Sequence, residues 1–397
     1  MNATIHMGRR CLFLIPWVLI LALGQLVGQD DISDEELDAL LADPDALDEW
    51  LEQEFSGWDF TAMGRVGWGH SDNVLLATVN PQSGDYLRSE FEAFLTHLPD
   101  ESGEFFSYLT LTDRRYSGVE DADKEQIFLS NTQWKRYLSD RLAGTLKVQY
   151  VYFDQILDLS LTERQETRQR IQFHSYGVGS NLDYQISPNH ELTLGFLVLR
   201  EEYAEVLGQD WMGRVDLAWE RPFWFSTQLT GRIRAEKRDY DDRAQRDVFG
   251  RPTEGDRLKV DRGSAMIEIS RDWGKSKAIE SAIEVRFLKN RDNGVGYYDY
   301  DQWSVGFSLE GEWKGFEART SVGIEDSEFG IQTVERFNPL PREKNDYWAE
   351  LFLRKDLGKR WSIYLLAEYV ESNSNVITDE YDAFSGSIGF QFELWGE

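Results

Sequence analysis

From about residue 58 onward, apolar and polar side chains alternate with a period of two along segments of about ten residues. Successive side chains of a β-strand point to opposite faces of its sheet, so each such segment predicts a strand with one apolar and one polar face. The segment before the C-terminus is the clearest example, because an apolar set alternates there with Ser385, Ser387 and Gln391; the set consists of Phe384, Gly386, Ile388, Phe390, Phe392 and Leu394. The same alternation recurs in residues 142–152, 176–186, 225–235, 263–269, 279–287, 303–313 and 316–325.

The lengths of the segments and of their connections distinguish a membrane barrel from a soluble sandwich, which also alternates. Ordinary strands have about five or six residues, whereas a tilted strand that crosses a bilayer needs about ten. Tight turns are predicted at 99–103, 139–141, 187–189, 221–223, 274–276, 314–315 and 356–360, and they alternate with longer polar loops at 77–88, 114–125, 154–168, 236–258, 289–300, 325–346 and 371–382. Short turns at one end and long loops at the other are typical of bacterial outer-membrane barrels.

The predicted fold class is all-β, a transmembrane antiparallel barrel over residues 58–397. An opening strand from Phe60, seven hairpins and a closing strand give about 16 strands. Residues 89–98, 104–113 and 126–138 alternate poorly, so 14 strands remain the alternative. A closed barrel pairs every backbone group within the sheet, which explains how a membrane protein can have a mean hydropathy of −0.51.

Half of the 14 tryptophans fall beside the predicted tight turns. Indole suits the membrane interface, since its ring is apolar and its N–H can reach water. The alternative is that these are core residues of a soluble protein, which would be spread along the strands. We therefore predict membrane-interface positions for Trp134, Trp219, Trp224, Trp273, Trp313, Trp361 and Trp395.

The N-terminal region differs in composition from the rest. Arg9 and Arg10 precede a 13-residue apolar run that Pro16 interrupts, which predicts a secretory signal peptide over residues 1–24. Residues 25–57 form an acidic periplasmic segment, with twelve Asp and Glu between Asp30 and Glu54 and no Lys or Arg. Its leucines and Trp50 favour short amphipathic helices, and a disordered tail is the alternative. A periplasmic partner of this segment is possible.

The charge and the sparse His and Cys exclude several functions. The formal charge is −29 and no basic block is present, so nucleic acid is not an expected partner. Two His–Ser neighbours, at 70–71 and 174–175, point to opposite faces of their strands and therefore do not form local catalytic pairs. No His or Cys cluster has metal-ligand spacing. We predict no catalytic residues, no metal, no cofactor and no enzyme activity.

Two motifs carry a resemblance to known proteins. The C-terminal segment resembles the strand signal at the end of bacterial outer-membrane β-barrel proteins; its sequence is Phe390-Gln391-Phe392-Glu393-Leu394-Trp395. This resemblance implies the barrel assembly machinery as a partner. The sequence Gly69-His70-Ser71-Asp72-Asn73-Val74 resembles the first-strand motif of barrels in polysaccharide export systems and of surface lipoprotein assembly modifiers. The resemblance covers Trp58 to Trp395 and implies a porin-like barrel among outer-membrane lipids, with glycan export as one possible function.

The polar faces carry charges of both signs, as the wall of an aqueous channel does. The predicted pore-lining residues are Arg232, Arg234, Glu268, Glu284, Arg286, Glu310, Glu312, Glu317 and Arg319. We expect an outer-membrane channel for passive passage of small hydrophilic solutes or for glycan export. Two alternatives stay open: an ion-pair network that blocks the lumen, and a non-conducting scaffold or adhesin that acts through its surface loops, notably 236–258 and 325–346.

Overall fold

The computed structural model describes residues 57–97, 103–119, 122–158, 168–204, 208–223, 226–274, 279–335 and 338–395. The predicted signal peptide, residues 25–56 of the acidic segment and Trp224 lie outside these residues. Within the described ranges, no helix is long and apolar enough to cross a membrane.

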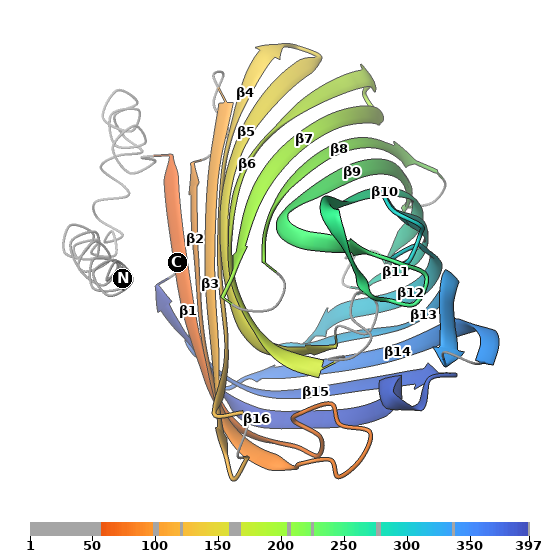
Figure 1. Ribbon diagram of the computed structural model, residues 1–397. Coiled ribbons are helices and arrows are strands. Elements are labelled where there is room, and N and C mark those ends of the chain that lie inside the picture. Colours follow the sequence, from red (N-terminus) through yellow and green to blue (C-terminus); the bar gives the residue numbers. More distant parts are fainter. Residues whose placement is uncertain are drawn as a thin grey trace, which may run out of the picture. The chain divides into compact units, whose positions relative to one another are not determined.

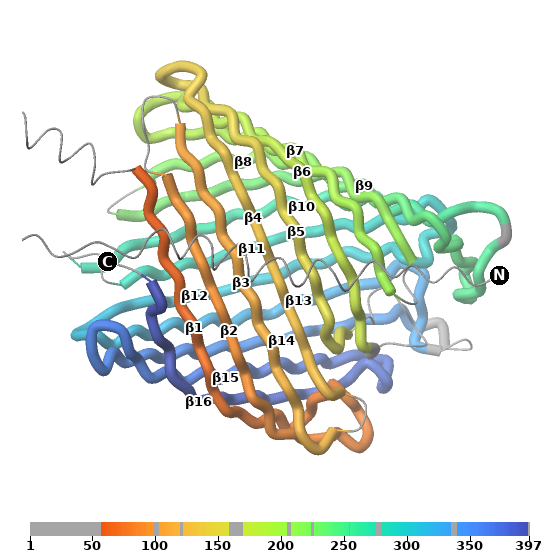
Figure 2. Tube along the Cα trace, turned by 90° about the vertical axis from the view of Figure 1, so that its left-hand side faces the viewer, coloured from red at the N-terminus to blue at the C-terminus, as the bar shows by residue number. Residues whose placement is uncertain are grey.

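Sixteen antiparallel strands form one closed barrel in chain order, and β1 closes the ring by pairing with β16 (Figure 1). Neighbouring strands run side by side and are inclined to the axis of the barrel, as β1 to β4 show in Figure 2. The 16-strand prediction is confirmed. The strands are β1 (Trp58–Ser71), β2 (Gly84–His97), β3 (Gly103–Ser117), β4 (Lys124–Ser139), β5 (Leu142–Asp158), β6 (Arg168–Ser187), β7 (His190–Tyr203), β8 (Gln209–Pro222), β9 (Thr227–Arg246), β10 (Pro252–Trp273), β11 (Ile279–Asp292), β12 (Tyr300–Trp313), β13 (Phe316–Glu335), β14 (Asn338–Asp356), β15 (Trp361–Ser374) and β16 (Tyr381–Trp395), with the 3-10 turn η1 (Ile377–Asp379) before β16.

The short connections lie at the predicted positions, but two predicted loops are wrong. Most of 236–258 belongs to β9 and β10, which have 20 and 22 residues, and most of 325–346 belongs to β13 and β14, which have 20 and 19. The sequence there is polar on both faces, which suggested a loop. A hairpin that extends beyond the bilayer meets water on both sides, so its strands need no apolar face.

Contacts between strands that are not neighbours identify the inner face of the barrel. Arg114 on β3 reaches Glu368 on β15 at 2.6 Å, although three strands separate them around the ring. Such side chains diverge on the convex outer surface, so they can meet only inside. From Glu368, the alternation and the strand register assign inward and outward positions all around the barrel.

The outer face is apolar. On β16, outward Ile388 is 52% exposed while its inward neighbour Ser387 is 6% exposed. Outward Val178, Ile233 and Ile267 are likewise more than half exposed. A belt of exposed aliphatic side chains around a closed sheet is the surface of a barrel that lies in lipid.

The poor alternation of 89–98, 104–113 and 126–138 has a structural cause. These residues lie in β2, β3 and β4, where both faces carry apolar groups. On β3, Leu111 points outward, whereas Phe106 and Tyr108 share the inward face with Arg114. An apolar inner face removes the contrast on which period-two patterns depend.

A cluster of buried apolar side chains lies at the long-connection end, which we call the outer mouth. Tyr240, Leu258, Val260, Tyr297 and Tyr298 pack together there, all under 9% exposed. Deeper in the barrel, the ring of Trp348 lies across Gly323 on the neighbouring strand, where a Cβ would come within 2.0 Å of the indole. Glycine at 323 therefore lets a large ring lie flat on the inner wall.

Candidate functional site

All nine predicted pore-lining residues lie on the inward face, on strands β9 to β13. On β12 and β13, Arg319 contacts Glu310 at 3.1 Å and Glu317 at 2.5 Å. Glu317 also contacts Arg354 of β14 at 2.9 Å. The side chains of Arg319 and Glu310 are 52% and 56% exposed, so water reaches this pair from the interior. We call the inward face of β8 to β13 the open wall.

Four arginines of the open wall gather around a small cavity of about 180 Å³, which is lined by Arg232, Arg234, Glu236, Arg262, Ser264, Met266, Glu284, Arg286 and Leu288. Four arginines and two glutamates meet here. Arg234 pairs with Asp216 at 2.5 Å, and Arg286 and Glu284 are 3.6 Å apart. Arg232 has no ion-pair partner among the residues that the structure describes. Of the two remaining predicted residues, Glu268 stands directly across from Glu284, and Glu312 stands across from Glu317.

A second group of inward charges was missed by the sequence analysis. Arg65 contacts Glu90 at 3.1 Å and Glu92 at 3.0 Å, and Arg88 also pairs with Glu90. Arg114 joins this group to β15 through its 2.6 Å contact with Glu368. The guanidinium of Arg65 also lies 5.5 Å from the ring centre of Phe352 on β14.

We call this group the corner network: Arg65, Arg88, Glu90, Glu92, Arg114 and Glu368. Its arginines are at most 16% exposed, against 52% for Arg319 on the open wall. Side chains of β1 to β3 and of β14 to β16 thus meet inside the barrel and narrow it, although a cavity of about 210 Å³ remains beside Arg114 and Glu368. Arginine–glutamate pairs are unremarkable in an acidic sequence, so only the register could reveal this set.

At the outer mouth, an ion pair crosses the barrel. Lys344 of β14 contacts Asp158, the last residue of β5, at 2.9 Å, and also Asp346 at 2.6 Å. Six strands separate β5 from β14 by the shorter way around the ring. The contact therefore joins strands on nearly opposite sides of the barrel. Lys344 and Asp158 are only 4% and 9% exposed. Asp158 falls within the predicted loop at 154–168, and nothing in the sequence indicated that it meets β14.

The β13–β14 hairpin that carries Lys344 is held by a buried arginine. Arg342, 1% exposed, contacts Asp379 of η1 at 2.6 Å, donates to Gln332 at 2.8 Å and lies 4.5 Å from the ring centre of Phe329. Burial, with Asp158 nearby, raises the pKa of the Asp379 carboxyl above its ordinary value, although Arg342 opposes the change. Gln332 in turn donates to the backbone of Tyr297 at 2.8 Å. Three outer connections are therefore tied together.

The predicted interface tryptophans lie near the short connections. Trp134, Trp273, Trp313 and Trp361 point outward and are 54%, 44%, 69% and 57% exposed. Trp219 and Trp395 are half-buried. Lys314 lies 4.7 Å from the ring centre of Trp313, and Arg271 lies 4.1 Å from that of Trp273.

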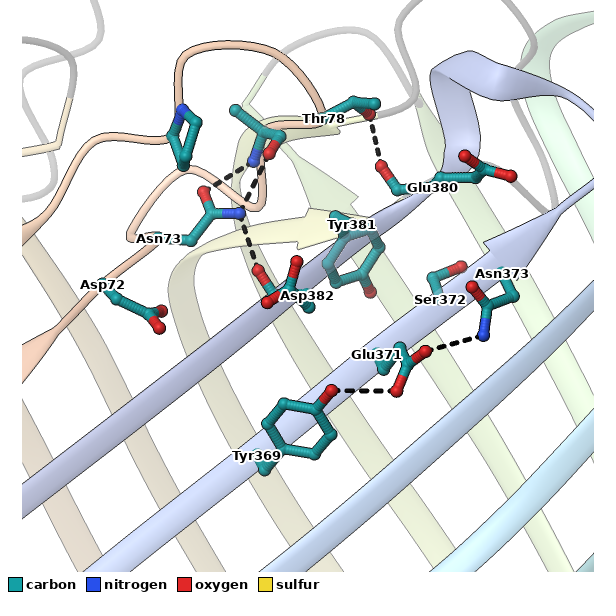
Figure 3. A pocket seen from close by; sticks show the side chains of 12 residues that line it. Asp72, Asn73, Thr78, Tyr369, Glu371, Ser372, Asn373, Glu380, Tyr381 and Asp382 are labelled. Atoms are coloured by element: carbon teal, nitrogen blue, oxygen red, sulfur yellow. Dashed lines mark hydrogen bonds between the residues drawn. The ribbon is translucent and has the colours of Figure 1, made fainter.

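The first-strand motif closes the barrel at its outer end. Asn73, 4% exposed, donates to the carbonyls of Ala77 and Asp382, and Asp72 accepts from the backbone of Phe384. These bonds join the β1–β2 connection to β16. Beside them lies a cleft of about 420 Å³ (Figure 3), lined on the outward side of β15 by Tyr369, Glu371 and Asn373, which bond to one another. The cleft belongs to the rim of the barrel and not to its lumen.

The histidines of the two His–Ser neighbours bind other residues. His70 contacts Asp85 on β2 at 2.7 Å, and His174 contacts the hydroxyl of Tyr150 at 2.9 Å on the outward face. Within the described residues, no three His, Cys, Asp or Glu side chains gather in a way that could hold a metal ion.

A closed 16-strand barrel with an apolar outer belt and a charged interior is a porin-type barrel of the bacterial outer membrane. No family model matches the sequence, and no curated protein matches it. Among solved structures, OccAB1 of Acinetobacter baumannii shares the fold, with a TM-score of 0.50 and 8% identity over 86% of this chain and 97% of that one.

Two further structures align with lower scores. OccK7 (OpdD) of Pseudomonas aeruginosa has a TM-score of 0.46 and 8% identity, over 86% of this chain and 100% of that one. A loop-deletion variant of OmpT, an outer membrane protein of Vibrio cholerae, has a TM-score of 0.42 and 8% identity over the same shares. At such identities the likeness to OccAB1 shows the fold alone, and the prediction of an outer-membrane β-barrel is confirmed at that level.

Proposed function

We propose that this barrel is a channel for the passive passage of small hydrophilic solutes across the outer membrane. The observation that carries the proposal is the exposure of the Arg319–Glu310 pair. Both side chains point inward and both are more than half exposed, so they face water at the short-connection end of the lumen. A ring of 16 strands is wide enough for an aqueous lumen.

Charges on the open wall would give this channel a mild preference for cations. Glu310, Glu312 and Glu317 stand on two consecutive strands, with Arg319 among them. The cluster of Arg232, Arg234, Arg262 and Arg286 stands on β9 to β11. The two groups would set up a field along the wall, because Arg286 stands opposite Ser304, six residues from Glu310 on β12.

Other predicted roles stay proposals of the same kind. The outward tryptophans would mark the periplasmic interface of the outer membrane, where indole is favoured. Glycan export is a narrower form of the channel proposal, supported only by the first-strand motif. The C-terminal strand would be recognised by the barrel assembly machinery, and the acidic segment would meet a periplasmic partner.

The second candidate is a closed scaffold that acts through its outer surface. It is favoured by the corner network, which fills part of the interior, and by the Lys344–Asp158 pair, which crosses the outer mouth. This reading requires the lumen to be blocked to ions at one level or more along its length.

Conductance in planar bilayers separates the two candidates. Purified protein in KCl should give steady ohmic steps if it is a channel, with reversal potentials that favour K⁺ in a KCl gradient. Silence at several voltages, from protein that still shows heat-modifiable gel mobility, would exclude the channel and support the scaffold.

A further inference from the structure

Apolar side chains form a continuous patch on the inward face of β4, β5 and β6. Ile127 stands opposite Phe153, Phe153 stands opposite Phe173, and Leu129 stands opposite Val151. The rings of Phe153 and Phe173 are stacked with their centres 5.3 Å apart. We call these five residues the apolar band.

The register shows that the apolar band faces the lumen. Ile127 and Leu129 follow Glu125 at steps of two on β4, and Glu125 lies 3.9 Å from Arg114, which reaches across to Glu368. The lipid-facing positions of β4 are instead those of Phe128 and Trp134. All five residues of the band are half-buried, so part of each side chain is open to the interior.

The band stands across the ring from the charged side of the open wall. In the strand order, β5 and β13 are eight places apart, which is half of a 16-strand ring. Phe153 is therefore on the opposite side from β13. There Glu325, which lies at a similar distance from its own short turn, faces inward and accepts a hydrogen bond from Gln302 of β12 at 2.7 Å. One wall of the lumen can make apolar contacts, and the facing wall can make hydrogen bonds and ionic contacts.

This arrangement complements a solute that has two kinds of face. Only something inside the lumen can cover the band, because lipid and surface partners meet the opposite side of the sheet. A fully polar solute gains nothing from Phe153 and Phe173. A fully apolar one would displace water from the charged groups of the open wall without replacing their hydrogen bonds. A molecule with a flat ring at one end and hydroxyls at the other can satisfy both walls.

We propose that the channel selects small polar solutes that carry a flat apolar ring, with aryl glycosides as the test class. The selection rests on the proposed channel function and names its substrate class. The ring lies against Phe153 and Phe173, and the hydroxyls face the open wall. Stacking on aromatic side chains contributes enough to raise affinity about two- to tenfold.

The test measures how sugars block the KCl current of single channels in planar bilayers. The probes are phenyl β-D-glucoside, methyl β-D-glucoside, which is smaller, and maltose, which is larger and fully polar. In an unselective pore, block depends on size alone, and the phenyl compound falls between the other two. We expect phenyl glucoside to halve the current at a concentration about two- to tenfold below that of either control sugar.

The variant F153T/F173T removes both rings and keeps residues that suit a strand. It should conduct KCl and block by size alone, with the phenyl compound between methyl glucoside and maltose. The matched control is F287T/F307T, which removes two rings from the outward face, where Phe287 and Phe307 are 44% and 39% exposed. This control should keep the phenyl preference over both other sugars.

Each other outcome overturns the proposal in a distinct way. A wild-type channel that conducts but responds to the sugars by size refutes the selection and leaves the channel intact; a segment of this chain lying on the band would give that result. A phenyl preference that persists in F153T/F173T places the contact elsewhere. A wild-type protein that does not conduct refutes the channel itself.

Discussion

The corner network and the open wall are built from the same residue types, yet they differ in exposure. Arg114 and Glu368 lie between strands that meet inside the barrel, whereas Arg319 and Glu310 stand on a wall that faces water. Removing one partner from a buried pair leaves an uncompensated charge, while an exposed pair contributes little to stability. The first set therefore holds the barrel together and the second is free to act on solutes.

The largest effect is expected from Arg114→Met. It leaves Glu368 and Glu125 without their closest cation, so unfolding should become easier by about 3–5 kcal/mol. The measurement is the temperature at which the compact form disappears on gels in detergent. Arg319→Met is the matched control on the open wall and should cost less than about 1 kcal/mol. Equal losses of stability in the two variants would show that the corner network is as accessible to water as the open wall.

The Lys344–Asp158 ion pair at the outer mouth should contribute a coupling free energy to stability and should also obstruct the flow of ions. A double-mutant cycle of Lys344→Gln and Asp158→Asn should give a coupling free energy of about 0.5–3 kcal/mol, since both groups are buried. Each variant should also raise the conductance of single channels, because the link across the mouth is lost. Unchanged conductance with clear coupling would mean that the narrowest point lies elsewhere.

The smallest effect concerns ion selectivity. Glu310→Gln with Glu312→Gln should lower the K⁺ preference about twofold, because a unit charge several ångströms away in water contributes less than about 1 kcal/mol. Reversal potentials in a KCl gradient measure the change. Glu90→Gln in the corner network is the control and should leave the potentials unchanged. Anion selectivity of the wild type would contradict the proposed field.

The sequence alone determined the barrel and the two sides of its wall. Because neighbouring side chains on a strand point to opposite faces, the alternation in residues 303–313 and 316–325 was enough to place Glu310, Glu312, Glu317 and Arg319 on one face. The short turns and the number of strands followed from the same local signal. The strand count was uncertain only where both faces are apolar, as in β3.

The tertiary structure decided which charges are buried and what crosses the interior. Arg114 and Glu368 are 254 residues apart, and Lys344 meets Asp158 from nearly the opposite side of the ring. Alternation assigns a face to each of these residues, but it carries no information about which distant strands converge. That depends on how the closed sheet curves, and the curvature of a 16-strand ring is a property of all its strands together.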